Sequence, residues 1–418
     1  MNVRDRFLLP LCAALAVAAC ARPQRAQDAY ASAVAEAVPK IQKETGLSFK
    51  RPPVYKIRSR AEMHTFLEKL FAEAKSARDL DAQQTFLRRL GVIPDTLDLH
   101  KLMLDLYTEQ VAGLYDPRTK VLYIVQGSDT DLATLDFTVE HELVHALQDQ
   151  YMNLDSVENL KGDDDRSMAA AAVIEGQATL VPLEAALGGG VDFPAGWDRV
   201  REAIRENQSS MPVMARTPEF LQEILIFPYL SGADFVHRFQ RERPGRMPYN
   251  AELPTSTSQI MHPREYFDSP QQLPITVTLP PPRAGALDYD NVMGEFTTKV
   301  MLYDRLKDQN QATAAADGWA GDRYALVKMP GGEGIAWLTV FRTAVDAGEF
   351  AQAMRSLAAL RYPKAPVRTS GVVTTISANG RTVTIWGGEI AGHSAVLYQD
   401  VPGGVESPIF DVARVRLN

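Results

Sequence analysis

Apolar residues recur at helical spacing along most of the first 270 residues, and shorter stretches have the pattern of strands. The helical spacing predicts helices at 29–45, 61–76, 80–91, 97–112, 131–152 and 168–187, the last interrupted by Pro182. β-prone runs predict strands at 54–58 and 121–125. The pattern of residues 195–270 is mainly helical and irregular. This part of the chain is therefore expected to be rich in helix, with a small sheet.

The pattern changes after residues 276–285, where three consecutive prolines can neither extend a helix nor pair in a central strand. Beyond this predicted linker, helices are expected at 292–307 and 346–360, and strands around Trp337, at 371–376 and at 381–386. The predicted fold class is α+β, with a helix-rich domain at 29–275 and a smaller α+β domain at 286–418.

The N-terminus has the pattern of a targeting segment. Residues 1–19 carry Arg4 and Arg6 ahead of an apolar stretch of signal-peptide length, too short to span a membrane as a mature helix. The four residues ending at Cys20 resemble the lipobox of bacterial lipoproteins. This resemblance implies acylation of Cys20, a tether at 20–28 and anchoring to a lipid bilayer. By resemblance to enterobacterial sorting, the alanine after Cys20 favours the periplasmic face of the outer membrane. The alternative is an ordinary secretory signal with a chance cysteine.

Composition narrows the function classes. The 44 basic and 52 acidic residues give a net charge of −8, and no basic block is present that could neutralise phosphates. Nucleic-acid binding is therefore not expected. No apolar run approaches the roughly 18 residues of a membrane span. Both cysteines, Cys12 and Cys20, lie in the first twenty residues, so no disulfide framework is predicted for the body of the fold.

The pentad His141-Glu142-Leu143-Val144-His145 lies within the predicted helix 131–152. At 3.6 residues per turn its two histidines are about 40° apart on one helix face, so they can bind a single ion. A helix with two solvated or core histidines is the alternative. A zinc ion in a hydrolase usually has three protein ligands and an open position for water, so a third donor is required.

Glu175 is the candidate third ligand, together with His141 and His145. It lies thirty residues beyond His145, amid alanines and aliphatic residues, where a carboxylate is costly to bury without a partner. Gly176 beside it would allow close packing against the histidine helix. A surface glutamate at a helix bend is the alternative. Asp149, one turn after His145, could accept the free ring N–H of that histidine, or could equally be exposed near the helix end.

These residues resemble the gluzincin metallopeptidases, the thermolysin-type group with two histidines and a glutamate on zinc: HELVHALQD is followed about thirty residues later by EGQA. Most of the mature chain also resembles a group of bacterial lipoproteins that share HE-x-x-HALQDQ with three further motifs. Here those motifs are Tyr115-Asp116-Pro117, STSQIMHPREY (256–266) and GWAGDR (318–323). Thermolysin-like enzymes have an aspartate four residues after the ligand glutamate, where this chain has Thr179.

The resemblance implies a zincin-like catalytic domain at 29–275 that holds one Zn²⁺ and hydrolyses peptide bonds in a peptide or protein substrate. Zinc lowers the pKa of its bound water, and Glu142 acts as general base and then returns the proton to the leaving amine. His262 and Tyr266 are the candidates for a further oxyanion donor, with Tyr229 third. The strand 121–125 is expected to be the edge strand that binds substrate, or else part of a core sheet.

Other interpretations of these motifs are also open. A lipoprotein scaffold on a zincin fold would keep the motif without cleaving its partners. A purely structural zinc site fits less well, because such sites usually have four protein ligands, often cysteines. Asp163-Asp164-Asp165 is read as a solvated loop that caps the next helix, rather than as a calcium site. Asp322 and Arg323 are expected to pair with each other or across the fold, and Trp319 and Trp337 to lie in the core.

Overall fold

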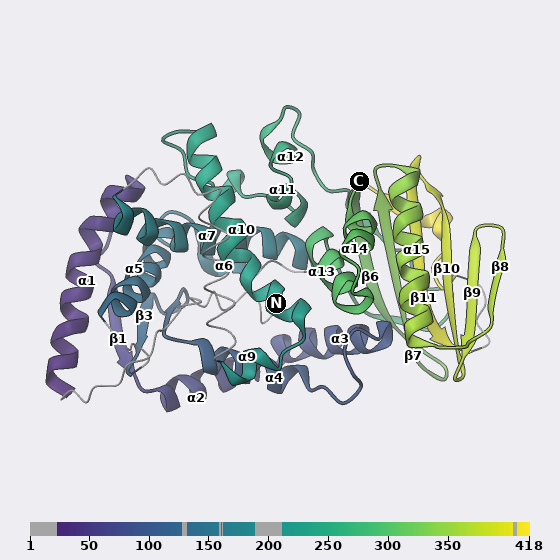
Figure 1. The fold of residues 1–418 in the computed structure, drawn as a ribbon, viewed down its shortest axis with the longest axis horizontal. Coiled ribbons are helices and arrows are strands. Elements are labelled where there is room, and N and C mark those ends of the chain that lie inside the picture. Colours follow the sequence, from purple (N-terminus) through teal and green to yellow (C-terminus); the bar gives the residue numbers. More distant parts are fainter. Residues whose placement is uncertain (1–22, 128–131, 159, 161, 189–210, 404–407) are drawn as a thin grey trace.

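The computed structural model describes residues 23–127, 132–158, 160, 162–188, 211–403 and 408–418. The predicted leader and Cys20 lie outside the described residues. Figure 1 shows an elongated molecule, with helices and a small sheet in the N-terminal part and a large sheet in the C-terminal part. The predicted α+β class is confirmed. None of the helices among the described residues is long and apolar enough to cross a membrane.

The N-terminal part consists of helices around a three-stranded sheet. Its elements are α1 (Pro23–Thr45), β1 (Val54–Arg58), α2 (Arg60–Phe71), α3 (Ala74–Leu90), α4 (Leu99–Gln110), β2 (Gly113–Asp116), β3 (Val121–Val125), α5 (Leu132–Gln148), α6 (Leu154–Glu158), α7 (Asp164–Leu187), α9 (Pro212–Ala215), α10 (Glu219–Glu242), η2 (Asn250–Glu252), α11 (Thr257–Met261) and α12 (Pro263–Phe267). Pro182 does not interrupt the last predicted helix of this part, because it lies inside the continuous α7.

The small sheet has the order β1-β3-β2, with β1 parallel and β2 antiparallel to β3. All five residues of β3 are buried, as its uninterrupted apolar sequence predicts. The expectation that 121–125 forms the edge strand is wrong, since β3 is the central strand. The edge next to the histidine helix α5 is β2, which a tight turn at Asp116 joins to β3. The core-sheet alternative for 121–125 is the one that the structure adopts.

Helices α7 and α10 pack against each other (Figure 1), and they come closest at two glycines. A Cβ on Gly176 would lie 2.1 Å from the carbonyl carbon of Gly232, and one on Gly232 would lie 1.9 Å from the carbonyl oxygen of Ala172. Only glycine fits at this distance between the two backbones. Gly176 therefore does serve close helix packing, but its partner is α10 and not the histidine helix.

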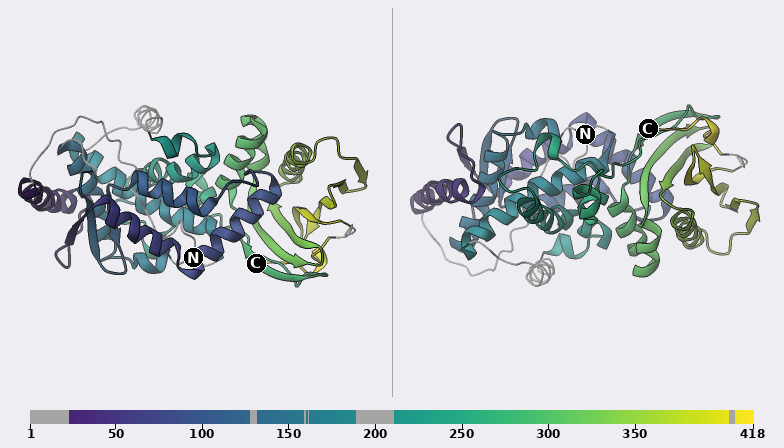
Figure 2. Two further views of the ribbon diagram at one scale, coloured as in Figure 1. Left: turned by 90° about the horizontal axis from the view of Figure 1, so that it is seen from below. Right: turned by 90° about the horizontal axis from the view of Figure 1, so that it is seen from above.

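The C-terminal part is built on a seven-stranded antiparallel sheet with the order β5-β6-β7-β11-β10-β9-β8. Its elements are β4 (Val277–Thr278), β5 (Ala286–Asn291), α13 (Glu295–Leu306), α14 (Gln309–Ala316), β6 (Trp319–Met329), β7 (Gly332–Phe341), α15 (Ala344–Arg361), β8 (Val367–Ser370), β9 (Val373–Ala378), β10 (Arg381–Ile390), β11 (His393–Pro402), η3 (Val412–Arg414) and β12 (Arg416–Leu417). Helix α15 packs on β7, β10 and β11, and α3 of the helical part reaches the sheet at β6 (Figure 2). The sheet begins at Ala286, while the domain boundary itself stays a prediction.

Asp322 is a buried acid that ties elements of the C-terminal part together, and its neighbour Arg323 reaches the helical part. Asp322 on β6 accepts hydrogen bonds from both indole N–H groups, those of Trp319 and Trp337, at 3.0 Å each, and from the backbone N–H groups of Met293 and Gly294 at 2.9 Å. Both tryptophans are buried, as expected. Arg323 does not pair with its neighbour Asp322. Its guanidinium binds the Gly162 carbonyl, at 2.6 Å, across to the helical part.

The Asp163-Asp164-Asp165 run is not a solvated loop. Asp163 caps α7 as expected, by accepting a hydrogen bond from the Arg166 N–H. Asp165 is only 2% exposed and binds the backbone N–H and hydroxyl of Thr257. A Cβ on Gly294 would lie 1.9 Å from the Asp165 carboxylate, so a glycine is required there. The N-terminus of α7 is thus fixed against both α11 and the start of α13.

Candidate metal centre

Helix α5 places His141 and His145 one turn apart on a buried face. The two residues are 1% and 2% exposed, and their Nε2 atoms lie 3.1 Å apart. The helix packs on α7, which brings Glu175 to the same point. A Glu175 carboxylate oxygen lies 3.1 Å from His141 Nε2, and the other oxygen lies 3.7 Å from His145 Nε2. The three predicted ligands therefore converge in a group that could hold a metal ion.

The spacing of these donor atoms fits a zinc ion. Ligand atoms about 2.0–2.1 Å from a tetrahedral ion are separated from one another by roughly 3.3 Å, close to the distances found here. Two imidazole nitrogens and one carboxylate also form a donor set that zinc takes in hydrolases. Glu175 is only 1% exposed, so its charge is costly to bury unless a cation neutralises it.

Burial sets the protonation of the two histidines. It lowers the pKa of His145 to about 4, although a hydrogen bond with Gln148 acts in the opposite direction. The pKa of His141 is also lowered, first by burial and then by the nearby His145. Both imidazoles are consequently neutral near pH 7, and the neutral form is the one that binds a metal.

Glu142 lies on the side of α5 that faces the edge strand β2. One carboxylate oxygen accepts the backbone N–H of Tyr115 at 2.6 Å, and the other is buried without a hydrogen-bond partner in the described part of the chain. Burial raises the pKa of Glu142 well above its ordinary value, while the hydrogen bond from Tyr115 lowers it. Gly113 lies against this side chain, since a Cβ there would be 2.8 Å from Glu142 Cγ. The carboxylate is therefore held in a defined position with one free oxygen.

Neither alternative for Asp149 holds: it does not orient His145, and it is not exposed. Asp149 is buried, and its carboxylate is taken by the Tyr115 hydroxyl and the Lys120 ammonium group, both at 2.7 Å, and by the backbone N–H of Leu154. The ring Nδ1 of His145 instead faces the side-chain oxygen of Gln148, 2.9 Å away. Along the helix, Gln148 and Asp149 lie about 60° and 40° to either side of His145, and the imidazole ring turns toward Gln148.

Of the three oxyanion candidates, only Tyr229 lies beside the ligands. It is on α10, buried, with its ring stacked on His141 at a centroid distance of 6.1 Å. Tyr266 uses its hydroxyl within the core, donating to the Glu252 carbonyl at 2.6 Å. His262 pairs with Glu295 of α13 at 2.6 Å. Neither of the latter two forms a hydrogen bond or ion pair with the three ligands in the described chain, so the structure does not support an oxyanion role for them.

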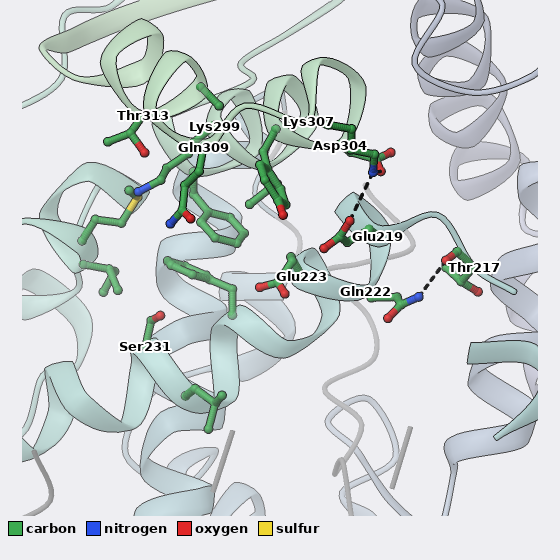
Figure 3. Close-up of a pocket in the computed structure, with 18 of the residues that line it drawn as sticks. Thr217, Glu219, Gln222, Glu223, Ser231, Lys299, Asp304, Lys307, Gln309 and Thr313 are labelled. Atoms are coloured by element: carbon green, nitrogen blue, oxygen red, sulfur yellow. Dashed lines mark hydrogen bonds and ion pairs between the residues drawn. The ribbon is translucent and has the colours of Figure 1, made fainter. Parts of the chain in front are cut away.

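His262, Glu295 and Asp317 form a second group of potential ligands. The separation of 2.6 Å between His262 and Glu295 is that of a charge-assisted hydrogen bond, and Asp317 lies 3.9 Å from the ring. This group is therefore an ion pair that joins the α11–α12 turn to α13. Beside it, a cavity of about 1370 Å³ lies between α10, α13 and α14, lined by both acidic and basic side chains (Figure 3).

Thr179 stands where thermolysin-like enzymes have an aspartate. Its side chain is 8% exposed, and its hydroxyl has no hydrogen-bond partner within the described residues. It therefore makes no polar contact with a ligand histidine. Near this position, Gln148 of α5 instead donates a hydrogen bond to Gln177 of α7 at 2.9 Å. Sequence reasoning assigned no role to either glutamine.

Comparison with known proteins adds little to this geometry. Residues 284–395 match the model of a domain family of unknown function, DUF8575, which covers part of the C-terminal sheet. No curated protein matches the chain. The chain is also similar to a solved structure from Chloroflexus aurantiacus, described as a "putative hydrolase with a novel fold". The match covers 60% of this chain and 91% of that one, at 18% identity and a TM-score of 0.38.

Proposed function

We propose that the protein is a zinc-dependent peptidase of the gluzincin kind. The observation that carries the proposal is the buried convergence of His141, His145 and Glu175, with Glu142 next to His141 in α5 and one of its carboxylate oxygens without a hydrogen bond in the described chain. The donor set and its spacing suit zinc, and the resemblance of HELVH and Glu175 to gluzincins supplies the reaction class. A bound zinc ion would lower the pKa of a water molecule toward neutrality.

In this proposal the chain itself handles the proton. The free oxygen of Glu142 accepts a proton from the attacking water and then delivers it to the nitrogen of the leaving amine, so that Glu142 ends as it began. The Tyr115 N–H holds the other oxygen in place throughout. Tyr229 is the remaining side-chain candidate for a contact to substrate at this site, because it lies next to His141.

The test combines zinc content with hydrolysis. We expect about one zinc per chain in the parent protein, little in His145→Ala, and full zinc in Glu142→Gln. Cleavage of a peptide library should fall by about 10²–10⁴-fold in Glu142→Gln, because the amide cannot accept the water proton. A folded parent that takes up no zinc would refute the proposal. Zinc binding without any hydrolysis would favour the scaffold reading.

We also propose that Cys20 is acylated and anchors the chain to a bacterial membrane, at the periplasmic face of the outer membrane. The support is the lipobox-like sequence that ends at Cys20. Cells fed a labelled fatty acid should incorporate it into the parent and not into Cys20→Ser. The variant should also leave the membrane fraction. Equal labelling of both proteins would contradict the proposal.

A further inference from the structure

Gln148, the last residue of α5, lies between the two helices that carry the candidate ligands. Its side chain is fully buried and makes three hydrogen bonds. The amide nitrogen donates to the Ile174 carbonyl and to the side-chain oxygen of Gln177, both at 2.9 Å, and the amide oxygen faces His145 Nδ1. Ile174 and Gln177 flank Glu175 on α7, so one side chain contacts the surroundings of two ligands.

The orientation of this amide is determined by its partners. A backbone carbonyl only accepts hydrogen bonds, so the Gln148 nitrogen must be the atom that faces Ile174. That same nitrogen can only donate, so the atom of Gln177 that receives the second bond must be its side-chain oxygen, which also accepts from the Tyr249 hydroxyl. The Gln148 oxygen is therefore left for His145, and because an amide oxygen cannot donate, His145 Nδ1 must carry the proton.

We propose that Gln148 is a positioning residue that holds His145 as its Nδ1–H tautomer, so that the Nε2 lone pair points at His141 and Glu175. With the proton on Nε2, His145 could not bind a metal through that atom. The inference rests on the proposed zinc site. It differs from the common arrangement in which a carboxylate or a backbone carbonyl takes the ring N–H, because here a neutral amide does so and also bonds the two ligand helices together.

The tautomer can be read directly from the metal-free protein. In protein labelled with ¹⁵N-histidine, with His145→Ala used to assign the signals, we expect a protonated Nδ1 and an unprotonated Nε2 at His145. In Gln148→Leu the proton should move to Nε2, since leucine offers no acceptor. An unprotonated Nδ1 in the parent would overturn the inference, as would an unchanged tautomer in the folded variant.

Zinc affinity, measured by competition with a chelator, gives a second readout. Gln148→Leu should bind zinc about 10–100-fold more weakly than the parent. Gln148→Glu keeps an acceptor for His145 but loses both donors, so its affinity should lie nearer to the parent's. Equal losses in both variants would assign the effect to the lost helix contacts and overturn the tautomer role.

Gln150→Leu is the matched control. Its amide binds the backbone of Arg51 and none of the ligands, so its zinc affinity should not change. A parent protein without zinc would refute the peptidase proposal but leave the tautomer measurement intact. A parent that binds zinc as tightly as Gln148→Leu would refute only the present inference.

Discussion

Gly113→Ala tests how tightly the edge strand holds the proposed general base. The backbone of Gly113 lies outside the left-handed region, so alanine meets no conformational penalty there and the effect is one of space alone. The new Cβ would lie 2.8 Å from Glu142 Cγ and 3.0 Å from a methyl carbon of Thr138. Ordinary carbon contacts are about 3.5–4.0 Å, so Glu142 must shift by roughly 0.7 Å or more.

Neither neighbour can move cheaply. Glu142 is fully buried and tied to the Tyr115 N–H, and Thr138 is fully buried on the preceding turn of α5. Overpacking of this kind costs about 1–3 kcal/mol of unfolding free energy. A misplacement of about 1 Å at a reacting group can lower the rate about 10²-fold. The three proposed ligands are untouched, so zinc content should stay at the parent value.

The assay measures urea denaturation, zinc per chain and peptide hydrolysis on the same preparations. Gly348→Ala is the matched control, because a Cβ there meets no atom within 4 Å inside α15. We expect the control to be neutral or stabilised by up to about 1 kcal/mol. Unchanged stability of Gly113→Ala would refute the packing argument, and full hydrolysis with zinc retained would refute the placement of Glu142 as the base.

Three further outcomes follow from other contacts. Asp322→Ala leaves four buried donors without their acceptor, so urea denaturation should show a loss of at least about 3 kcal/mol, whereas the exposed Asp317→Ala should change little. The hydrogen bond with Glu295 raises the pKa of His262, so the stability that charged His262 contributes is complete below about pH 6.5 and is lost as the pH rises through the raised pKa. The difference in unfolding free energy between the parent and His262→Gln should therefore be larger at pH 6 than at pH 9. An equal difference at both pH values would contradict this. Removing zinc with a chelator should lower the melting temperature of the parent and not of His145→Ala. For the parent, the loss relative to protein with free zinc 1,000-fold above its Kd should be equivalent to about 4 kcal/mol.

The sequence predicted elements best where one local signal dominated. The helix that carries the histidines and the apolar strand 121–125 were both found, because their patterns persist over several residues. Strand β11, and β2 with its four residues, were missed. Their assignment depends on pairing partners far along the chain, and single-sequence periodicity contains no record of those partners.

Buried acids show a second limit. Asp165 and Asp322 look like surface residues by type, and acids are seldom fully buried. Their positions become understandable only once Thr257 of α11, Trp337 of β7 and the backbone before α13 supply donors from other elements. The GWAGDR motif thus has a structural use: Asp322 fastens β6 to β7 and to the start of α13, and Arg323 reaches Gly162 of the helical part.

The candidate site also contains residues that local sequence could predict and residues that it could not. His141 and His145 could be assigned from spacing because one helix carries both, and Glu175 because an isolated acid in an apolar helix requires a partner. The choice between Gln148 and Asp149 could not be made in this way, since both lie at the C-terminal end of the histidine helix and flank His145 at similar angles. Chemical preference favoured the carboxylate. Tyr115 and Lys120, which come from β2 and the turn after it, take that carboxylate and leave His145 to the amide, so the tertiary neighbours of Asp149 decide what holds the ligand.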